Sequence, residues 1–249
     1  MKDWYLMRKP PVYSSGFESE EFEYYAKDGF KEALNSFLGT DVILYDNQLQ
    51  NGIEARAIIQ NASADSYTSA VNRQILLDID FGDGIYYVYD KSQDIYWIVN
   101  SPVSRNKIYS KVSAWYCKLW LKFISPLSQA VVSYPVYTIN STQYNSGETS
   151  NQKFTIGSAQ HLIYIPYNEE TALIDNGFRF LMDQPTPIPN AYRLTQVDST
   201  SFLYKNISLL QWTVMEDQFS PVRDNKDLMV ADYYKEPETG GTKDPDIFW

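Results

Sequence analysis

The chain has 249 residues, which is enough for one large domain or two small ones with hydrophobic cores. A hydrophobic content of 44% excludes general disorder, and a net charge of −10 without any run of Lys and Arg argues against binding to the phosphate backbone of nucleic acids. An acidic surface can still line a channel through which DNA slides, because like charges repel each other.

Cysteine usage and the opening residues indicate a reducing compartment. Cys117 is the only cysteine, so neither an intrachain disulfide nor a thiolate metal cluster can form within the chain. The opening residues lack the apolar run of a signal peptide, and no stretch reaches the length that spans a membrane. We therefore expect synthesis in the cytosol and no membrane partner.

The first predicted elements are an extended N-terminal arm and one helix, which together occupy residues 1–39. Pro10 and Pro11 favour the extended arm. Apolar side chains then recur at helical spacing, at Phe22, Ala26, Phe30, Ala33 and Phe37. Glutamates precede this stripe and Gly39 follows it, which is typical of the start and the end of a helix.

Residues 40–125 change to alternating apolar and polar positions, which predicts β-strands. The segments are short, rich in β-branched and aromatic residues and separated by turn residues; they read DVILYD, IEARAIIQ, RQILLDIDF, GIYYVYD, DIYWIVN and KIYSKVSAWYCKLWLKF. Asp83 and Gly84 form a typical hairpin turn between two of them. Short strands with regular turns predict a small barrel or sandwich.

Residues 126–220 repeat this pattern, with segments such as FTIGSAQHLIYIPY, ETALIDNG, GFRFLMDQP, AYRLTQVDS and LLQWTVMED. Aligning Trp97 with Phe180 also pairs Ile95 with Phe178, Val99 with Met182, Pro102 with Pro185 and Tyr109 with Tyr192. With a small gap, RQILLDI lies over QHLIYIP. We therefore predict a mainly β protein with two tandem small barrels or sandwiches, one N-terminal α-helix and extended terminal arms.

Residues 221–249 show no periodicity, contain Pro237 and Pro245, and predict an extended C-terminal arm. The arm ends in three large apolar residues, whose exposure to water costs free energy: Ile247, Phe248 and Trp249. Two interpretations are open. The tip folds back on its own barrel, or it anchors on a neighbouring subunit as a contact arm.

No catalytic motif accompanies the few reactive side chains. His161 is the only histidine, and its place in a predicted strand favours a structural role. No G-x-S-x-G elbow is present, and the aromatic and leucine neighbours of Cys117 are typical of a buried small hydrophobic residue. The sequence therefore favours a protein that is not an enzyme and that binds no cofactor.

Other activities are open on the residues alone. Asp78, Asp80, Asp83 and Asp90 cluster near one hairpin and could hold a hard cation, but no EF-hand spacing is present and we assign no metal site. A β-rich hydrolase with two carboxylates is a further possibility. Aromatic residues could stack on sugars in a carbohydrate-binding or receptor-binding module of a phage particle. These candidates are Tyr86, Tyr87, Tyr89, Tyr96, Trp97, Trp115, Tyr116 and Trp120.

Two blocks of sequence carry a resemblance to a known family. The first is RQILLDIDFGDGIYYVYDKSQDIYWIVNSPVS followed by YSKVSAWYCKLWLKF. The second is STQYNSGETSNQKFTIGSAQHLIYIPYNEETALIDNGFRFLMD. With the opening helix and YRLTQVDS, these blocks resemble the neck, or head-closure, proteins of tailed bacteriophages that infect Gram-positive bacteria. The resemblance covers most of residues 17–217, and it likens the first block to the small barrel of these proteins and the second to the second domain of longer members.

The resemblance implies a structural role in the neck of a virion that assembles in the host bacterial cytoplasm. Such proteins form rings, here of six or twelve copies, that extend the DNA channel, retain the packaged genome and offer the surface to which the tail attaches. The implied partners are the chain itself, the portal or adaptor protein, a tail terminator or tail-completion protein, and double-stranded DNA that passes without specific binding.

Candidate residues for this role lie in loops and at the C-terminus. We expect the carboxylates of Asp65, Asp90 and Asp94 to line the DNA channel and Ile247, Phe248 and Trp249 to form the arm at the subunit interface. Residues 61–72 form a polar loop that is either a plug of the channel or an ordinary solvated loop.

Overall fold

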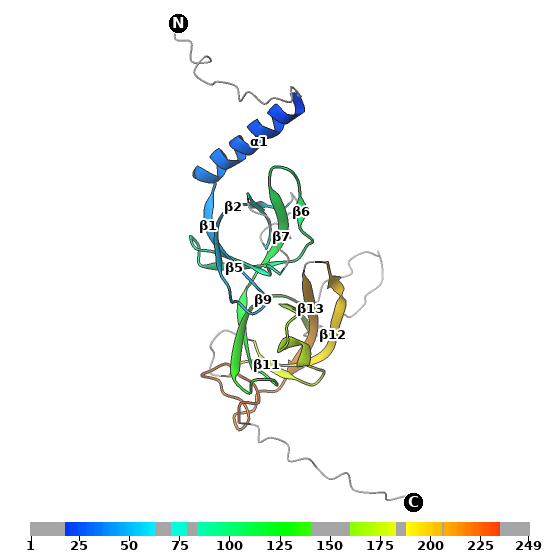
Figure 1. Ribbon diagram of the computed structural model, residues 1–249. Coiled ribbons are helices and arrows are strands. Elements are labelled where there is room, and N and C mark those ends of the chain that lie inside the picture. The colour runs from blue at the N-terminus through cyan, green and yellow to red at the C-terminus, as the bar shows by residue number, and fades with distance from the viewer. Residues whose placement is uncertain are drawn as a thin grey trace, which may run out of the picture.

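The computed structural model describes residues 18–62, 71–78, 84–140, 160–182, 188–205 and 207–234, and the side chains of the first helix from Phe22 onward. Figure 1 shows a helix, a first ring of strands and a second ring, which follow one another along the molecule. The structure confirms the predicted mainly β fold with two tandem barrels and one N-terminal helix.

Helix α1 (Glu18–Asn35) confirms the predicted helix. Its buried side holds Leu34, and the ring of Phe30 lies 5.2 Å from that of Tyr109 in the first barrel. The turn after the helix requires glycine, because a Cβ at Gly39 would lie 1.8 Å from the carbonyl oxygen of Leu34. Within the described residues, no helix has the length and apolar character needed to cross a membrane.

The first barrel contains β1 (Thr40–Tyr45), β2 (Ile53–Asn61), β3 (Asn72–Leu77), β4 (Tyr87–Asp90), β5 (Ile95–Val99), β6 (Ser104–Arg105) and β7 (Ser110–Tyr116). The strands are antiparallel in the order β3-β2-β1-β4-β5-β7, and a further ladder between β3 and β7 closes the ring. Aliphatic side chains fill its interior: Val42, Leu44, Ala57, Ile75, Leu77, Val88, Val99, Val112 and Ala114.

The second barrel contains β8 (Leu119–Ile124), β9 (Val131–Asn140), β10 (Gln160–Pro166), β11 (Arg179–Leu181), β12 (Ala191–Leu203) and β13 (Ser208–Asp217). Their order is β11-β12-β13-β10-β9-β8, and β11 and β8 lie close together at the remaining seam. Large aromatic side chains fill this core. The rings of Phe180 and Trp212 stack 5.4 Å apart, and the ring of Phe123 lies edge-on to both.

The two barrels share one topology. With the short β6 set aside, the first three strands of each barrel form a meander, and the fourth lies beside the first. The fifth pairs with the fourth, and the last pairs with the fifth and the third. The match of RQILLDI with QHLIYIP therefore falls on equivalent strands, β3 and β10. The match of Trp97 with Phe180 is one strand out of place, because β5 is equivalent to β12 and not to β11. Neighbouring strands have similar alternation, so pattern alone does not distinguish them.

The connecting segment between the two barrels is only two residues long. We expected one strand over residues 107–123, but β7 ends at Tyr116 and β8 begins at Leu119. The amide of Cys117 donates to the Tyr96 carbonyl of the first barrel at 2.9 Å, and the amide of Lys118 donates to the Val136 carbonyl of the second at 3.0 Å. The chain thus changes sheet at residues 117–118, before the boundary that we placed at residue 125 from sequence. Alternation continues through the link, so the sequence pattern did not reveal this change.

The segment ETALIDNG forms the short 3-10 helix η2 (Thr171–Leu173) where we expected a strand. The Asn168 side chain accepts hydrogen bonds from the amides of Glu170 at 3.0 Å and Thr171 at 2.8 Å. The Thr171 hydroxyl donates to the Pro166 carbonyl at 2.8 Å. These bonds satisfy the backbone locally, so the segment needs no partner strand.

Residues 221–234 are also not extended, although we expected an arm from residue 221 onward. They form a series of turns in which Val230 and Ala231 are buried against the second barrel. Figure 1 shows this segment at the end of the molecule opposite α1. Its fold depends on ion pairs with the second barrel, which the next section describes.

Candidate functional site

A row of outward-facing side chains joins the first barrel to the second. Tyr45, Tyr87, Ile98 and Trp115 are successive cross-strand neighbours on β1, β4, β5 and β7. Alternation along the strands turns this row away from the interior of the first barrel. Tyr87 and Ile98 are nevertheless 0% exposed, because the second barrel covers them. The row therefore serves as the contact between the barrels.

Aromatic rings from both barrels meet at this joint. The ring centroid of Trp115 lies 4.7 Å from that of Tyr164, 4.9 Å from that of Tyr137 and 5.5 Å from that of Phe202. Contacts of this kind stabilise an interface beyond the apolar area that they bury. Part of the high aromatic content of the sequence thus serves a contact within one chain.

Polar atoms at the joint are paired as well. The Tyr87 hydroxyl donates to the Pro135 carbonyl at 3.0 Å, and the Ser208 amide donates to the Tyr86 hydroxyl at 3.2 Å. Burial raises the pKa of Tyr86 and of Tyr87, so both hydroxyls stay neutral at physiological pH. The joint is a packed and hydrogen-bonded interface that holds the two barrels in one orientation.

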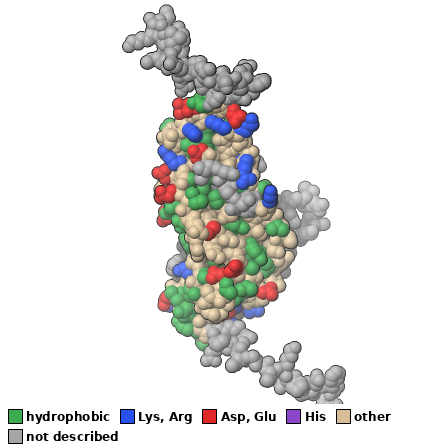
Figure 2. Space-filling model, in the orientation of Figure 1, with side chains coloured by type: hydrophobic (Ala, Val, Ile, Leu, Met, Phe, Trp, Pro, Cys, Tyr) green, Lys and Arg blue, Asp and Glu red, His purple; other side chains and the backbone are tan. Residues whose placement is uncertain are grey.

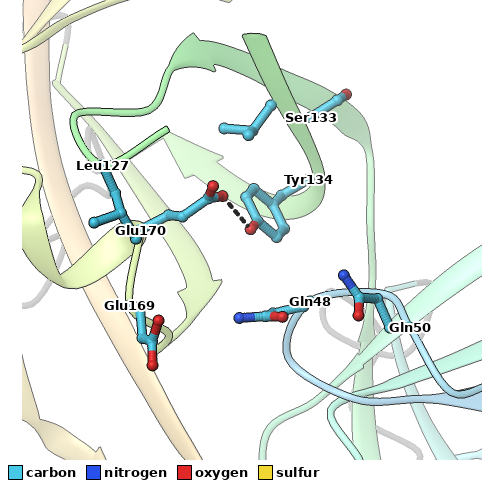
Figure 3. Close-up of a pocket in the computed structure, with 8 residues that line it drawn as sticks. Gln48, Gln50, Leu127, Ser133, Tyr134, Glu169 and Glu170 are labelled. Atoms are coloured by element: carbon cyan, nitrogen blue, oxygen red, sulfur yellow. Dashed lines mark hydrogen bonds between the residues drawn. The ribbon is translucent and has the colours of Figure 1, made fainter. Parts of the chain in front are cut away.

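A polar cavity of about 300 Å³ lies at the edge of this joint (Figure 3). Its lining comes from the β1–β2 turn and the second barrel: Gln48, Gln50, Leu127, Val132, Ser133, Tyr134, Glu169 and Glu170. The Tyr134 hydroxyl donates to Glu170 at 2.8 Å. Burial and then this hydrogen bond raise the pKa of Tyr134, which makes the hydroxyl a poorer nucleophile. The pair joins β9 to the segment before η2 within the second barrel.

Beyond the joint, the outer surface of β1, β4 and β5 continues to solvent. The ring of Tyr96 lies 4.7 Å from that of its cross-strand neighbour Tyr89 and 5.1 Å from that of Trp120 on β8. Trp120 remains 47% exposed. Asp41 on β1 and Glu54 on β2 carry carboxylates on the same outer surface. We name this surface the acidic-aromatic face; its members are Asp41, Glu54, Tyr89, Tyr96 and Trp120.

A second polar pocket, of about 280 Å³, occupies the mouth of the first barrel. The Arg73 guanidinium lies 5.7 Å from the centre of the Trp97 ring, and Asp90 also lines the pocket. Asp90 is 1% exposed, and its Oδ1 accepts hydrogen bonds from the Ser92 amide at 2.8 Å and the Ser92 hydroxyl at 2.7 Å. Asp90 therefore shapes the β4–β5 turn and is not on the outer surface, which differs from its expected place in a channel lining.

The structure describes only some of the other residues that we expected in the channel and at the subunit interface. Asp94 is exposed, has a φ of 56°, and accepts a hydrogen bond from the Tyr89 hydroxyl at 2.9 Å. Asp65 and most of the loop at residues 61–72 lie outside the described residues, as does the C-terminal tip formed by Ile247, Phe248 and Trp249. The channel role of Asp94 stays a prediction.

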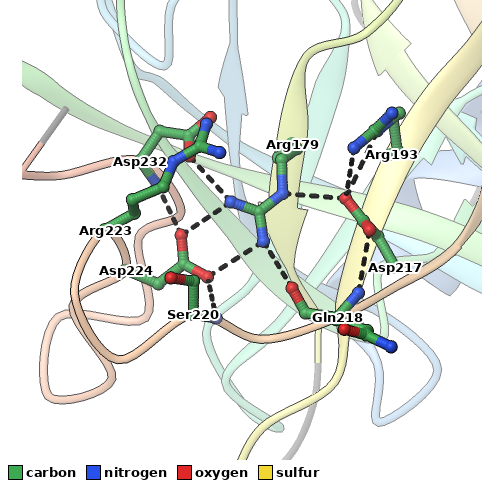
Figure 4. Close-up of polar contacts among 8 residues, drawn as sticks. All are labelled: Arg179, Arg193, Asp217, Gln218, Ser220, Arg223, Asp224 and Asp232. Atoms are coloured by element: carbon green, nitrogen blue, oxygen red, sulfur yellow. Dashed lines mark hydrogen bonds and ion pairs between the residues drawn. The ribbon is translucent and has the colours of Figure 1, made fainter.

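A buried ion-pair cluster binds the C-terminal segment to the second barrel (Figure 4). We name it the Arg179 clamp. Arg179 on β11 is 5% exposed and donates to Asp217 at 2.9 Å, to both oxygens of Asp224 at 2.9 and 3.0 Å, and to Asp232 at 2.7 Å. Its remaining donor reaches the Gln218 carbonyl at 2.6 Å. One side chain thereby connects β11 to residues from 217 to 232.

Each charge in the clamp is compensated by others. Burial alone would lower the pKa of Arg179, but its bonds to Asp224 and Asp232 raise it overall. Burial raises the pKa of Asp217, and hydrogen bonds from the Gln218 amide and Arg179 outweigh this and lower it. Sequence reasoning missed the clamp. A possible signal was Arg179 itself, the only cation in the apolar segment GFRFLMDQP.

The side chains with reactive atoms lie in structural surroundings. His161 on β10 is half-buried and edge-on to Tyr192, with the ring centroids 5.1 Å apart. Burial lowers the pKa of His161, and the charge of Glu216 raises it by less. Cys117 is a buried free thiol whose pKa is raised by burial, which is opposite to the activation of a nucleophile.

The expected aspartate cluster cannot be assembled from the described residues. Asp80 and Asp83 lie outside them, and Asp78 lines a pocket with Arg105 and Lys107. Among the residues that the structure describes, no group of three His, Cys, Asp or Glu side chains is suited to a metal ion. The expected hairpin turn at Asp83 and Gly84 is wrong, because the strands before and after it do not pair with each other. β3 pairs with β2 and β7, and β4 pairs with β1 and β5.

The aromatic residues proposed for a sugar surface divide into two groups. Tyr86, Tyr87 and Trp97 are buried, and Trp115 packs in the joint. Trp120 is the most exposed of the eight, beside the half-buried rings of the acidic-aromatic face. Any stacking surface for a sugar would therefore centre on Trp120.

Apolar side chains remain uncovered at both ends of the molecule. At the helix end, Phe22 is 65% exposed and Phe37 is 95% exposed. At the opposite end, Ile188 and Tyr234 line a groove of about 480 Å³ next to the clamp. Figure 2 shows Lys and Arg gathered around the helix and the first barrel, and hydrophobic side chains spread over the second. Exposed apolar groups at such ends are typical of contact surfaces.

The fold defines a tandem β-barrel protein with one N-terminal helix and large aromatic contact surfaces. Residues 14–114, which contain α1 and most of the first barrel, match the family model of the YomX N-terminal domain. This family is of phage type, from a Bacillus prophage, and the match is consistent with a phage origin of the chain. No curated protein matches the chain.

Two solved structures show a distant similarity. Both are of MrkH, one described as from K. pneumoniae and the other as a c-di-GMP dependent transcription regulatory factor. Each is 8% identical in sequence over 80% of this chain and 85% of the other, with TM-scores of 0.26 and 0.24. A similarity this weak says nothing about the function of this chain.

Proposed function

We propose that this chain is a structural component of a phage neck and not an enzyme. It forms a ring below the portal or adaptor, extends the DNA channel, retains the packaged genome and offers the surface to which the tail attaches. One observation carries the proposal: a chain with a phage-type N-terminal part has two firmly joined barrels that leave apolar and aromatic surfaces uncovered. These surfaces are suited to partners within an assembly.

The two ends of the molecule suit different partners. The α1 end and the clamp end lie at opposite extremes of Figure 1, so one can meet the portal or adaptor while the other meets a tail terminator or tail-completion protein. Copies of the chain, six or twelve to a ring, pack side by side between them. The net charge of −10 favours a channel through which double-stranded DNA passes without binding. Asp94 is our candidate for that lining.

Electron microscopy of mutant particles tests the proposed function. A phage with a stop codon early in this gene, grown in a non-suppressing host, should yield separate tails beside empty or leaking heads. A plasmid copy of the gene should restore tailed particles, which excludes an effect on neighbouring genes. Filled, tailed particles from the mutant that merely fail to adsorb would rule out the neck.

The exposed Trp120 supports a second candidate, a carbohydrate-binding or receptor-binding module. Its ring lies edge-on to Tyr96, so a sugar could stack on one side of it. In this case the chain should bind a glycan array, and Trp120→Ala should abolish binding while the protein stays folded. Trp97→Ala is not a suitable test, because Trp97 is 4% exposed and its loss would disturb the core. A blank array with folded protein would remove this candidate.

A further inference from the structure

The first barrel carries two unlike surfaces on opposite sides. In its closed ring, β1-β2-β3-β7-β5-β4, two strands separate β1 from β7 in either direction, so β1 and β7 lie across the barrel from each other. The acidic-aromatic face covers the β1 side. The β6–β7 hairpin on the other side carries Arg105, Lys107 and Lys111, and we name these residues the basic hairpin.

The basic hairpin stands out in an acidic chain. Residues 95–147 contain five Lys and Arg and no Asp or Glu, although the whole chain has a net charge of −10. Arg105 is exposed, and the side chain of Lys107 is 80% exposed while it contacts Glu23 of α1. The hairpin therefore presents the cations of Arg105 and Lys107 to solvent on one side of the barrel, while Lys111 is half-buried.

The opposite face has the chemistry that binds such cations. The side chains of Asp41 and Glu54 are 69% and 78% exposed, although Arg56 and Lys91 each contact one oxygen of them. A carboxylate has two oxygens and can accept a second cation. The rings of Tyr96 and Trp120 lie further along the same outer surface, across β1 and β4 from Glu54. Guanidinium and ammonium groups also bind aromatic faces.

We propose that the acidic-aromatic face of one copy binds the basic hairpin of a second copy of this chain. The contact is heterologous, since it joins two different surfaces, and repetition of such a contact closes a ring or extends a filament. This inference rests on the proposed ring and identifies the surfaces that build it. Because the surfaces lie on opposite sides of one barrel, each copy can contact two neighbours at once.

Charge reversal in the full-length chain tests the contact. Wild-type protein should self-associate at low ionic strength, and added salt should weaken the association. Arg105→Glu with Lys111→Glu, and separately Asp41→Lys with Glu54→Lys, should each weaken self-association roughly tenfold or more in sedimentation equilibrium. A mixture of the two variants should associate again, because each contributes one unchanged surface to a wild-type contact.

Lys205→Glu with Asp175→Lys is the matched control, since both residues are exposed on the second barrel, and this variant should associate like the wild type. A wild-type chain that stays monomeric at low salt, or variant mixtures that stay monomeric, would overturn the contact. Intact necks in phage that carry Arg105→Glu with Lys111→Glu would also overturn it while leaving the proposed neck function in place. Circular dichroism of each variant excludes unfolding as the cause.

Discussion

Replacing Arg179 with methionine should destabilise the folded chain by about 3–5 kcal/mol, because it leaves buried carboxylates without their cation. Asp224, 3% exposed, loses both bonds to the guanidinium, and residues 218–234 lose their attachment to β11. Urea unfolding measures the loss of stability. Hydrogen exchange should show faster exchange in residues 218–234 than in the first barrel.

Arg193→Ala is the matched control for this prediction. Arg193 also contacts Asp217, at 3.1 Å, but its side chain is 55% exposed, so its loss should cost less than about 1 kcal/mol. An Arg179→Met variant as stable as Arg193→Ala would show that the clamp contributes little to stability.

The clamp also predicts how stability changes with pH. The folded-state pKa of Asp217 lies below its ordinary value, so its contribution is present at neutral pH and is lost as the pH falls through that lowered pKa. The stability difference between wild type and Arg179→Met should therefore shrink in acid. A difference that grows below pH 4 would contradict this account.

Replacing Trp115 with alanine should cost about 3 kcal/mol, near the lower end for loss of a large aromatic side chain, because Trp115 is only partly buried. The variant loses three ring contacts across the joint, with Tyr137, Tyr164 and Phe202. The barrels should then unfold less cooperatively, and a protease should cut more readily near Cys117 and Lys118. Limited proteolysis and thermal unfolding measure both effects.

Trp120→Ala provides the comparison, since Trp120 is 47% exposed at the rim of the same region. Its loss should change the free energy of unfolding by no more than about 1 kcal/mol, which is well below the cost of Trp115→Ala. Equal losses for the two tryptophans would mean that the outer rim, and not the ring cluster around Trp115, holds the barrels together.

Alternation in the sequence was enough to predict the class of fold but not the identity of each strand. The strands at IEARAIIQ, DIYWIVN and LLQWTVMED appear close to their predicted places, because a strand with one buried side has a period of two whatever its partners are. The same property hides which strand pairs with which. It caused the one-strand displacement of Trp97 against Phe180 and concealed the link at Cys117 and Lys118.

The candidate surfaces were harder to predict, because they combine residues that are distant in sequence. The ring of Tyr96 meets that of Trp120 only because the second barrel docks on the first. Arg179 meets Asp224 and Asp232 across 45 and 53 residues. Asp90 illustrates the opposite error, since a loop carboxylate that reads as exposed is buried by its own turn. No one-dimensional pattern encodes such distances.

The two-residue link between the barrels has a mechanical consequence. With Cys117 and Lys118 each bonded to a different barrel and with the joint packed beside them, the described chain has no slack between its halves. A force on the helix end is therefore transmitted to the clamp end. The rigid chain fixes the distance between the partners that bind at its two ends. Residues inserted at the link would change the angle between the two barrels before they increased the length of the molecule.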